Sequence, residues 1–214
     1  MVNLIQPTLE FMDKGGVMLY TIVFASWIAL AIIIERFWSF RRMQVQRKKL
    51  MANIGASLRR KKVIEAISIC DKIPRPLARV VKAGLLRHDR GKVEIKEAMQ
   101  EAGQEEIPEM ERYLPILGTL SYITPLLGFL GTVLGMIAVF VDIQREVTFA
   151  TAAGLAGGIW EALISTAAGL GVAIPILIAY NYFVGRVDGF LLDVEGAAAD
   201  LVNLLSPPGG GYEV

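Results

Sequence analysis

Three long runs of uncharged, mostly apolar residues dominate the pattern of the chain. They cover residues 17–34, 114–141 and 162–185. A helix of about 20 apolar residues is long enough to cross the hydrocarbon core of a bilayer. The pattern therefore predicts an all-α, polytopic membrane protein with three transmembrane helices. We place these helices at residues 17–38, 113–141 and 155–185.

The segments between the predicted spans differ sharply in charge. Residues 39–112 hold 18 of the 22 Lys and Arg residues, and nine of these lie within residues 39–62, which contain no Asp or Glu. Basic residues next to a span are retained on the cytoplasmic side of a membrane. The middle segment is therefore predicted to be cytoplasmic. The same rule places residues 1–16 and the turn at 142–154 in the periplasm, and residues 186–214 in the cytoplasm.

The middle segment has the composition of a folded helical region. Helices are predicted at residues 63–70, 77–87 and 93–113, with breaks at the prolines of residues 73–76 and at Asp89-Arg90-Gly91. Seven acidic residues lie within residues 94–111. Two explanations of this charge segregation remain open, namely solvation of an exposed face and ion pairing with the basic run. Residues 186–214 are expected to form a helix followed by a disordered tail from Ser206.

Several residues are predicted to lie at a membrane surface. Residues 1–16 are expected to form a periplasmic interfacial segment. Glu35 and Arg36 follow the first apolar run and are expected to pair locally or to extend toward the interface. A set of four basic residues is predicted to bind anionic lipid headgroups. These are Arg41, Arg42, Lys48 and Lys49.

Composition and motifs argue against several function classes. The formal net charge of +1 gives no reason to expect a nucleic-acid partner. Cys70 is the single cysteine, so no intrachain disulfide forms, and His88 is the single histidine and is expected on the surface. We find no phosphate-binding loop, nucleophile elbow or paired carboxylates in an apolar setting. We therefore expect no enzymatic activity, catalytic residue, cofactor or metal site.

Small and polar residues recur inside the second and third predicted spans. Small residues allow transmembrane helices to approach closely, so tight helix packing explains most of the glycines. In the third span the repeated positions, four residues apart, are Ala153, Gly157, Glu161, Ser165, Gly169 and Ala173. In the second span they are Thr124, Gly128 and Thr132, together with Gly131 and Gly135. Pro125, which is expected to kink the second span, and Pro175 in the third complete the predicted packing set.

Three polar side chains in these spans are candidates for chemistry. An acidic or basic side chain at the centre of a membrane helix costs about 2.5–3.5 kcal/mol. Glu161 is therefore expected to face a cavity or pore, to be hydrogen-bonded or to be protonated. The structural alternative is a glutamate buried at a subunit contact, with a hydrogen bond to Ser165 or to a backbone group. The hydroxyls of Thr132 and Thr166 can donate and accept at once, as a proton path requires. Their alternative is a hydrogen bond to a carbonyl of their own helix.

The second and third spans also carry a family resemblance. The second contains Pro125-Leu-Leu-Gly-Phe-Leu-Gly-Thr-Val-Leu-Gly-Met136. The third contains Glu161-Ala-Leu-Ile-Ser-Thr-Ala-Ala-Gly-Leu-Gly-Val-Ala-Ile-Pro175, followed by Ala179-Tyr-Asn181. Both motifs resemble the signature helices of the MotA/TolQ/ExbB proton-channel family, in its ExbB/TolQ branch. The number of spans and the large segment between the first two agree with that family.

The resemblance implies an assembly and a mechanism. Members of the family form a pentamer in the bacterial inner membrane, whose pore encloses a dimer of a single-spanning ExbD/TolR-like partner. An aspartate of this partner takes up and releases protons near the threonines that match Thr132 and Thr166. The family's glutamate matches Glu161, and Ser165 is included with it in the predicted pore lining. Proton flow then drives work on the cell envelope through a TonB- or TolA-like protein.

Two other function classes compete with the motor subunit. The glycine stripes are also consistent with a non-conducting oligomeric scaffold. A self-contained solute transporter is disfavoured, because three spans do not provide the inverted repeats typical of that class. The sequence leaves open whether the client process is nutrient import, envelope integrity or motility.

Overall fold

The computed structural model describes residues 16–43, 47–145 and 152–205. Every regular element in these ranges is an α-helix, which confirms the all-α prediction. The helices are α2 (Gly16–Met43), α3 (Arg47–Arg59), α4 (Val63–Asp71), α5 (Pro76–Leu86), α6 (Lys92–Glu111), α7 (Leu114–Arg145) and α8 (Ala152–Leu205). Three of them are long and apolar enough to cross a membrane, as predicted. The predicted interfacial segment and the tail after Leu205 lie outside the described residues, apart from Gly16.

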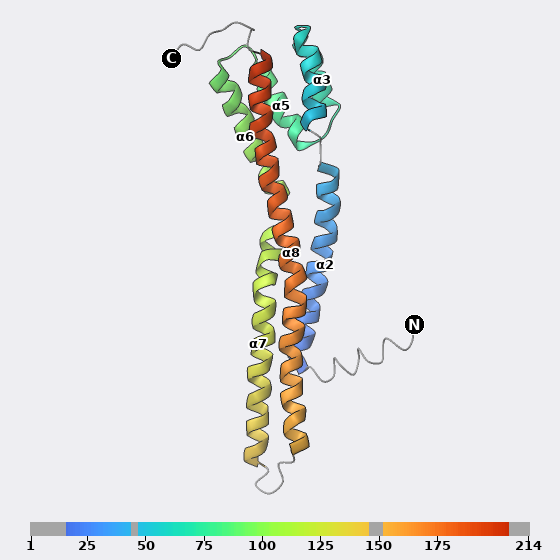
Figure 1. Ribbon diagram of the computed structural model, residues 1–214, viewed down its shortest axis with the longest axis vertical. Coiled ribbons are helices and arrows are strands. Elements are labelled where there is room, and N and C mark those ends of the chain that lie inside the picture. Colours follow the sequence, from blue (N-terminus) through green and yellow to red (C-terminus); the bar gives the residue numbers. More distant parts are fainter. Residues whose placement is uncertain (1–15, 44–46, 146–151, 206–214) are drawn as a thin grey trace, which may run out of the picture. The chain divides into compact units, whose positions relative to one another are not determined.

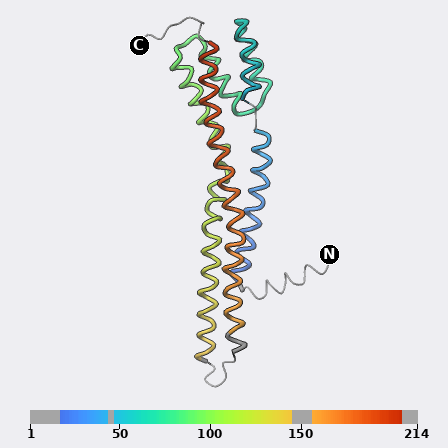
Figure 2. The backbone as a smooth tube through the Cα atoms, in the orientation of Figure 1, coloured from blue at the N-terminus to red at the C-terminus, as the bar shows by residue number. Residues whose placement is uncertain are grey.

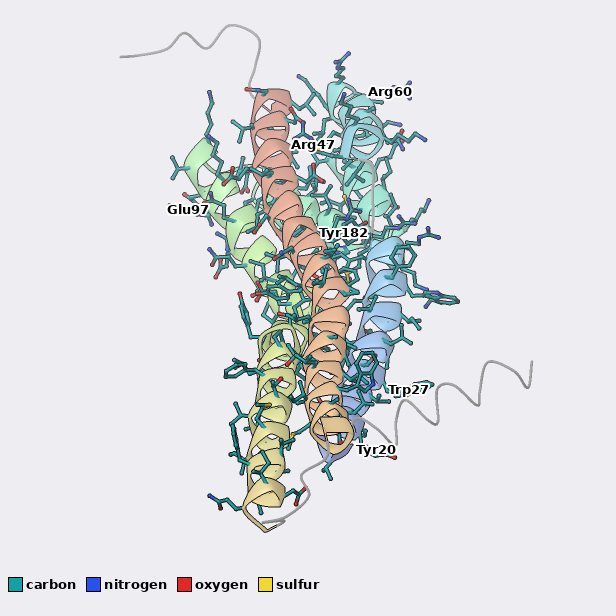
Figure 3. The ribbon with its side chains drawn as sticks, turned by 60° about the horizontal axis from the view of Figure 1, so that its bottom comes forward. Tyr20, Trp27, Arg47, Arg60, Glu97 and Tyr182 are labelled. Atoms are coloured by element: carbon teal, nitrogen blue, oxygen red, sulfur yellow. The ribbon has the colours of Figure 1, made fainter. Side chains whose placement is uncertain are left out.

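The chain divides into two compact units. We call residues 1–35 and 113–182 the membrane unit, and residues 36–112 and 183–214 the head unit. In the membrane unit, α7 and the first part of α8 run side by side (Figure 1). Tyr20 and Trp27 project from α2 in Figure 3, and both are exposed, as expected of side chains that face lipid.

Helix α8 is a single helix of 54 residues (Figure 2). We expected a boundary between residues 185 and 186, where the uncharged run ends. The helix continues through Arg186 because leaving a membrane changes which side chains are favourable but does not interrupt backbone hydrogen bonding. Pro175 also lies inside the helix. Likewise, α2 extends to Met43, beyond the predicted end of its span at residue 38.

The head unit has its own hydrophobic core. Helices α3 to α6 and the last third of α8 contribute to it. Its fully buried side chains include Ile54, Val80, Leu85, Met99 and Leu201. Helix α3 was not predicted, because the nine Lys and Arg residues within residues 39–62 drew attention away from the apolar positions between them. The sequence does contain a helix signal here, because Leu50, Ile54 and Leu58 follow one another at a spacing of four residues. All three residues are buried.

Cys70 is part of this core and is 4 % exposed. Burial raises the pKa of its thiol from 9.0 to about 11, with a further contribution from the neighbouring carboxylate of Asp71. The thiol is therefore protonated near neutral pH and unreactive, as expected of a structural cysteine.

Ion pairs connect the helices of the head unit. Arg79 on α5 pairs with Glu106 on α6 through two hydrogen bonds, and these bonds raise the pKa of the Arg79 guanidinium. Arg47 from the basic run lies beside α8 (Figure 3), where its Nε is 3.7 Å from a carboxylate oxygen of Asp200. The acidic residues of α6 thus contribute to pairing, through Glu106 with Arg79 on α5 and through Glu94 with Arg90 at 3.8 Å.

Arg36 occupies an unexpected position in the head unit. Its side chain is 3 % exposed. Its guanidinium Nη1 donates to the carbonyls of Glu109 at 3.1 Å and Met110 at 3.4 Å. These carbonyls belong to the last turn of α6. Carbonyls in the last turn of an α-helix have no N–H partner within the helix. The structure thus adds a role that the sequence did not predict, namely a buried cap at the end of α6.

Candidate functional site

The candidate site forms where α7 and α8 come closest together. A Cβ atom on Gly128 would lie 2.8 Å from the carbonyl oxygen of Ser165 and 3.0 Å from the Cα of Thr166. A Cβ on Gly169 would lie 2.8 Å from the carbonyl oxygen of Thr124. The two distances of 2.8 Å are shorter than a Cβ and a backbone atom allow, so a larger residue at either position would force the backbones apart. The two backbones are therefore in direct contact.

This crossing brings the two candidate threonines together. The hydroxyls of Thr132 on α7 and Thr166 on α8 are hydrogen-bonded to each other. The Thr166 hydroxyl also donates to the carbonyl of Gly128 at 3.0 Å. The Thr132 hydroxyl lies 3.2 Å from the carbonyl of Ala162 and 3.3 Å from that of Gly128. The two hydroxyls thus share a cluster of carbonyl acceptors drawn from both helices.

The protons of this cluster have more than one arrangement. Each hydroxyl carries a single proton and can accept through its oxygen. When Thr166 donates to Gly128, its oxygen accepts from Thr132. When Thr132 donates to Ala162, its oxygen accepts from Thr166 instead. Thr132 bonds to the carbonyl of Gly128 on its own helix, whereas Thr166 donates to that same carbonyl across the contact. A role of either hydroxyl in a proton path stays a prediction.

Other predicted packing residues lie along the same contact. A Cβ on Gly131 would lie 2.7 Å from the Cβ of Ser165, and one on Gly135 would lie 2.9 Å from the Cβ of Ala162. Ser165 is 2 % exposed, and its hydroxyl lies 3.4 Å from the carbonyl of Glu161. The structure therefore places Ser165 in the contact between α7 and α8.

The structure separates Glu161 and Gly157 from this contact. Glu161 is exposed, and a Cβ on Gly157 would meet no atom within 4 Å. The reason is geometric, because a step of four residues turns about 40° around an α-helix. Positions from 153 to 173 therefore do not share one face. Packing against α7 passes instead through Gly158 and Ala162, two positions that the four-residue pattern did not include.

Glu161 lies at an open hollow that is also lined by Ala156, Gly157 and Trp160. In α7 and in α8 up to Tyr182, the carboxylates are Asp142 and Glu161, and both are exposed. No carboxylate accompanies the threonine pair in the described part of these helices. The described residues also contain no cluster of three or more His, Cys, Asp or Glu side chains with metal-binding geometry.

The two prolines occupy the interiors of their helices. Pro125 lies within α7, and Pro175 lies within α8. Next to Pro125, the buried Thr124 hydroxyl donates to the carbonyl of Leu120 at 2.6 Å. Ser121 is buried as well and donates to the carbonyl of Gly118 at 2.6 Å. Both hydroxyls donate hydrogen bonds to carbonyls of their own helix, as expected of Ser and Thr in an apolar setting.

The four predicted lipid-binding residues lie on the surface of the head unit. The Arg41 guanidinium stacks on Phe37 at 4.4 Å from the ring centre, and that of Arg42 stacks on Trp38 at 5.6 Å. Lys48 and Lys49 are exposed on α3. Arginine stacked on aromatic rings just beyond an apolar run is typical of a membrane interface. A headgroup role for these residues stays a prediction.

Comparisons with known proteins agree with the signature motifs. Residues 72–196 match the profile of the MotA/TolQ/ExbB proton channel family. The ExbB-like 3 protein of Synechocystis sp. is 32 % identical over 170 residues, covering 79 % of this chain and 81 % of that protein. An ExbB homologue of Methanothermobacter thermautotrophicus is 28 % identical over 91 % of this chain and 69 % of its own length. The Tol-Pal system protein TolQ of Pseudomonas aeruginosa is 44 % identical over 43 % of this chain and 39 % of its own.

Proposed function

Because this chain belongs to the ExbB/TolQ branch of the MotA/TolQ/ExbB proton channel family, we propose that it is the channel subunit of a motor driven by the proton motive force. In this proposal, several copies of the chain, five by analogy with the family, enclose a dimer of an ExbD/TolR-like partner. The complex lies in the bacterial inner membrane, with the N-terminus in the periplasm and the C-terminus in the cytoplasm.

The observation that carries the proposal is the hydrogen-bonded pair of Thr132 and Thr166. A hydroxyl pair with alternative proton arrangements can pass a hydrogen bond along without becoming charged. It cannot take up a proton at accessible pH, so a titratable group must come from elsewhere. We assign that role to an aspartate of the single-spanning partner, positioned near these threonines by analogy with the family.

Glu161 has a different place in this proposal. Its exposure in the single chain is compatible with a position facing the pore or a neighbouring subunit. Either position gives an ionised carboxylate the water or hydrogen bonds that a lipid-facing position lacks. We propose that it shapes the water-filled entry to the threonine pair, on the open side of α8 that also carries Gly157.

The energy available is sufficient for a coupled movement. One elementary charge crossing a membrane releases about 2.3 kcal/mol for each 100 mV of potential. That is several times thermal energy, so a proton step can bias the rotation of the partner relative to the surrounding subunits. Work on the envelope would then pass through a TonB- or TolA-like protein.

The experiment is proton flux in liposomes that contain this chain with its single-spanning partner. Replacing Thr132 and Thr166 together by Val keeps their shape and removes both hydroxyls. We expect the double variant to lose proton flux while the complex still assembles. The matched control is Thr119→Val on the same helix, because the exposed Thr119 hydroxyl donates to the carbonyl of Pro115 on its own helix at 2.8 Å. Unchanged flux in the double variant would favour the non-conducting scaffold.

A further inference from the structure

The head unit contains a cavity of about 160 Å³ that the proposed proton path does not use. It lies between the end of α2, the start of α5 and residues 185–193 of α8. Its apolar wall includes Phe40, Leu77 and Phe190. Phe40 is held in place by a stacked ring, Phe183, at 5.5 Å between ring centres. The cavity is therefore built on ordered core side chains and not on a surface loop.

Two opposite charges line the same cavity, namely Arg186 and Asp193 of α8. They are seven residues apart, so they lie on the same side of the helix, about 10 Å apart along its axis. Both side chains are half-buried. Across residues 16–43, 47–145 and 152–205, neither side chain makes a hydrogen bond or an ion pair. The cavity thus presents one unpaired cation and one unpaired carboxylate to a ligand.

The position of the two charges along α8 indicates where the ligand comes from. Arg186 is the first charged residue after the uncharged run at 162–185, and Asp193 follows two turns later. The headgroup layer begins where the hydrocarbon core ends and is about 5–8 Å thick in each leaflet. Arg186 therefore lies at the level of lipid phosphates, and Asp193 lies toward the water. This order matches a phospholipid whose phosphate is linked to an outer amine.

We propose that this cavity binds the headgroup of an amine-bearing phospholipid, of which phosphatidylethanolamine is the chemical type. The Arg186 guanidinium donates to the phosphate, and the Asp193 carboxylate accepts from the primary ammonium. The aromatic wall of Phe40 and Phe190 covers the glycerol end of the lipid.

The same chemistry defines what the cavity disfavours. Phosphatidylcholine carries a trimethylated nitrogen that has no N–H to donate to Asp193. Phosphatidylglycerol offers this carboxylate a neutral hydroxyl in place of a cation. The site is distinct from Arg41, Arg42, Lys48 and Lys49, which are exposed cations without an acidic neighbour in the cavity.

The test is native mass spectrometry of the full-length, delipidated chain. It is titrated with phosphatidylethanolamine, phosphatidylcholine and phosphatidylglycerol of identical acyl chains. We expect the ethanolamine lipid to bind about tenfold more tightly than the choline lipid, as one charge-assisted hydrogen bond provides. Asp193→Asn should bring this ratio close to one, and Arg186→Gln should weaken binding of all three lipids.

Two controls make the result decisive. Asp188→Asn and Arg87→Gln neutralise exposed charges outside the cavity and should leave the lipid preference unchanged. The melting temperatures of all variants are compared, so that a loss of binding is not confused with a loss of folding. Equal binding of the ethanolamine and choline lipids by the wild type would overturn the proposal. So would tight binding of soluble phosphoethanolamine alone, since that would identify a water-soluble ligand.

Discussion

The hydroxyl groups of Thr132 on α7 and Thr166 on α8 are hydrogen-bonded to each other across the contact between the two helices. The bond depends on Gly128, one turn before Thr132, because this glycine lets the backbone of α8 approach at Thr166. Gly128 also provides the carbonyl to which Thr166 donates. Packing and chemistry at the site are therefore two properties of the same few residues.

The first prediction separates the hydroxyl of Thr166 from its methyl group. Thr166→Ser keeps the hydroxyl and should retain most of the proton flux. Thr166→Val keeps the volume and should lose it, because the bond to Thr132 and the donation to Gly128 both disappear. The measurement is proton flux in liposomes containing the assembled complex. If Ser and Val variants lose flux equally, packing of the methyl group and not the hydroxyl is what matters.

The second prediction concerns the glycine crossing. Gly128→Ala places a methyl group against the backbone of α8 and should destabilise the membrane unit by about 1–3 kcal/mol, as overpacking does. Gly157→Ala is the matched control, since a Cβ there meets no atom of the described chain. It should be neutral or stabilising by up to about 1 kcal/mol through helix propensity. Thermal unfolding of both variants in detergent measures the difference.

A strong loss of stability in Gly157→Ala, seen only in the assembled complex, would have another meaning. It would show that the open side of α8 is covered by a neighbouring subunit. The same loss in the dissociated chain would contradict the structure.

The third prediction concerns Arg36. Arg36→Met removes the donors for the carbonyls of Glu109 and Met110, and unsatisfied buried acceptors cost about 1–3 kcal/mol. Amide hydrogen exchange in the last turn of α6 should accelerate accordingly. Arg42→Met is the control, because Arg42 is exposed and its guanidinium stacks on Trp38, away from the end of α6 in sequence. Equal protection of α6 in both variants would argue against the capping role.

The fourth prediction is a pH dependence. The folded state holds the Cys70 proton up to a pKa of about 11, whereas the unfolded thiol loses it near its ordinary value of 9.0. The unfolded state therefore binds fewer protons between these values, and stability falls as pH rises from about 9 to about 11. Below pH 9 this contribution is fully present. The full change is about 2–3 kcal/mol for two pKa units.

This dependence is measured as a difference between two proteins. Cys70→Ala lacks the thiol and should show a shallower loss of stability over the same pH range, while lysines and tyrosines titrate in both. Parallel stability curves for the two proteins from pH 9 to 11 would contradict the buried, protonated thiol.

Much of the fold was predictable because its strongest signals are local. Uncharged runs identified the spans, and the prolines at residues 74 and 76 and the turn at residues 89–91 identified breaks between head-unit helices. These features act through length and backbone chemistry, which the sequence displays directly. The continuation of α8 beyond Gly185 was missed because a change in side-chain polarity was interpreted as the end of a helix.

The candidate site was predictable in its residues but less so in its geometry. The sequence singled out Thr132 and Thr166 for a proton path without predicting their mutual contact, and the structure brings the two hydroxyls together. We grouped Gly157 and Glu161 with Ser165 because they recur every four residues in the sequence. Such a row of positions turns gradually around the helix, so its members do not share one face. The capping role of Arg36 could not be predicted, because its acceptors lie more than 70 residues away in sequence.

The burial of Cys70 has a practical consequence for all of these experiments. The chain has one cysteine, and its thiol is both enclosed by the core and protonated at neutral pH. Maleimide reagents, which are attacked by thiolates, should therefore leave the folded wild type unlabelled. A cysteine introduced at an exposed position such as Gly157 would then carry a fluorophore or spin label alone. The natural protein thus already provides the silent background that site-specific labelling and crosslinking to a partner require.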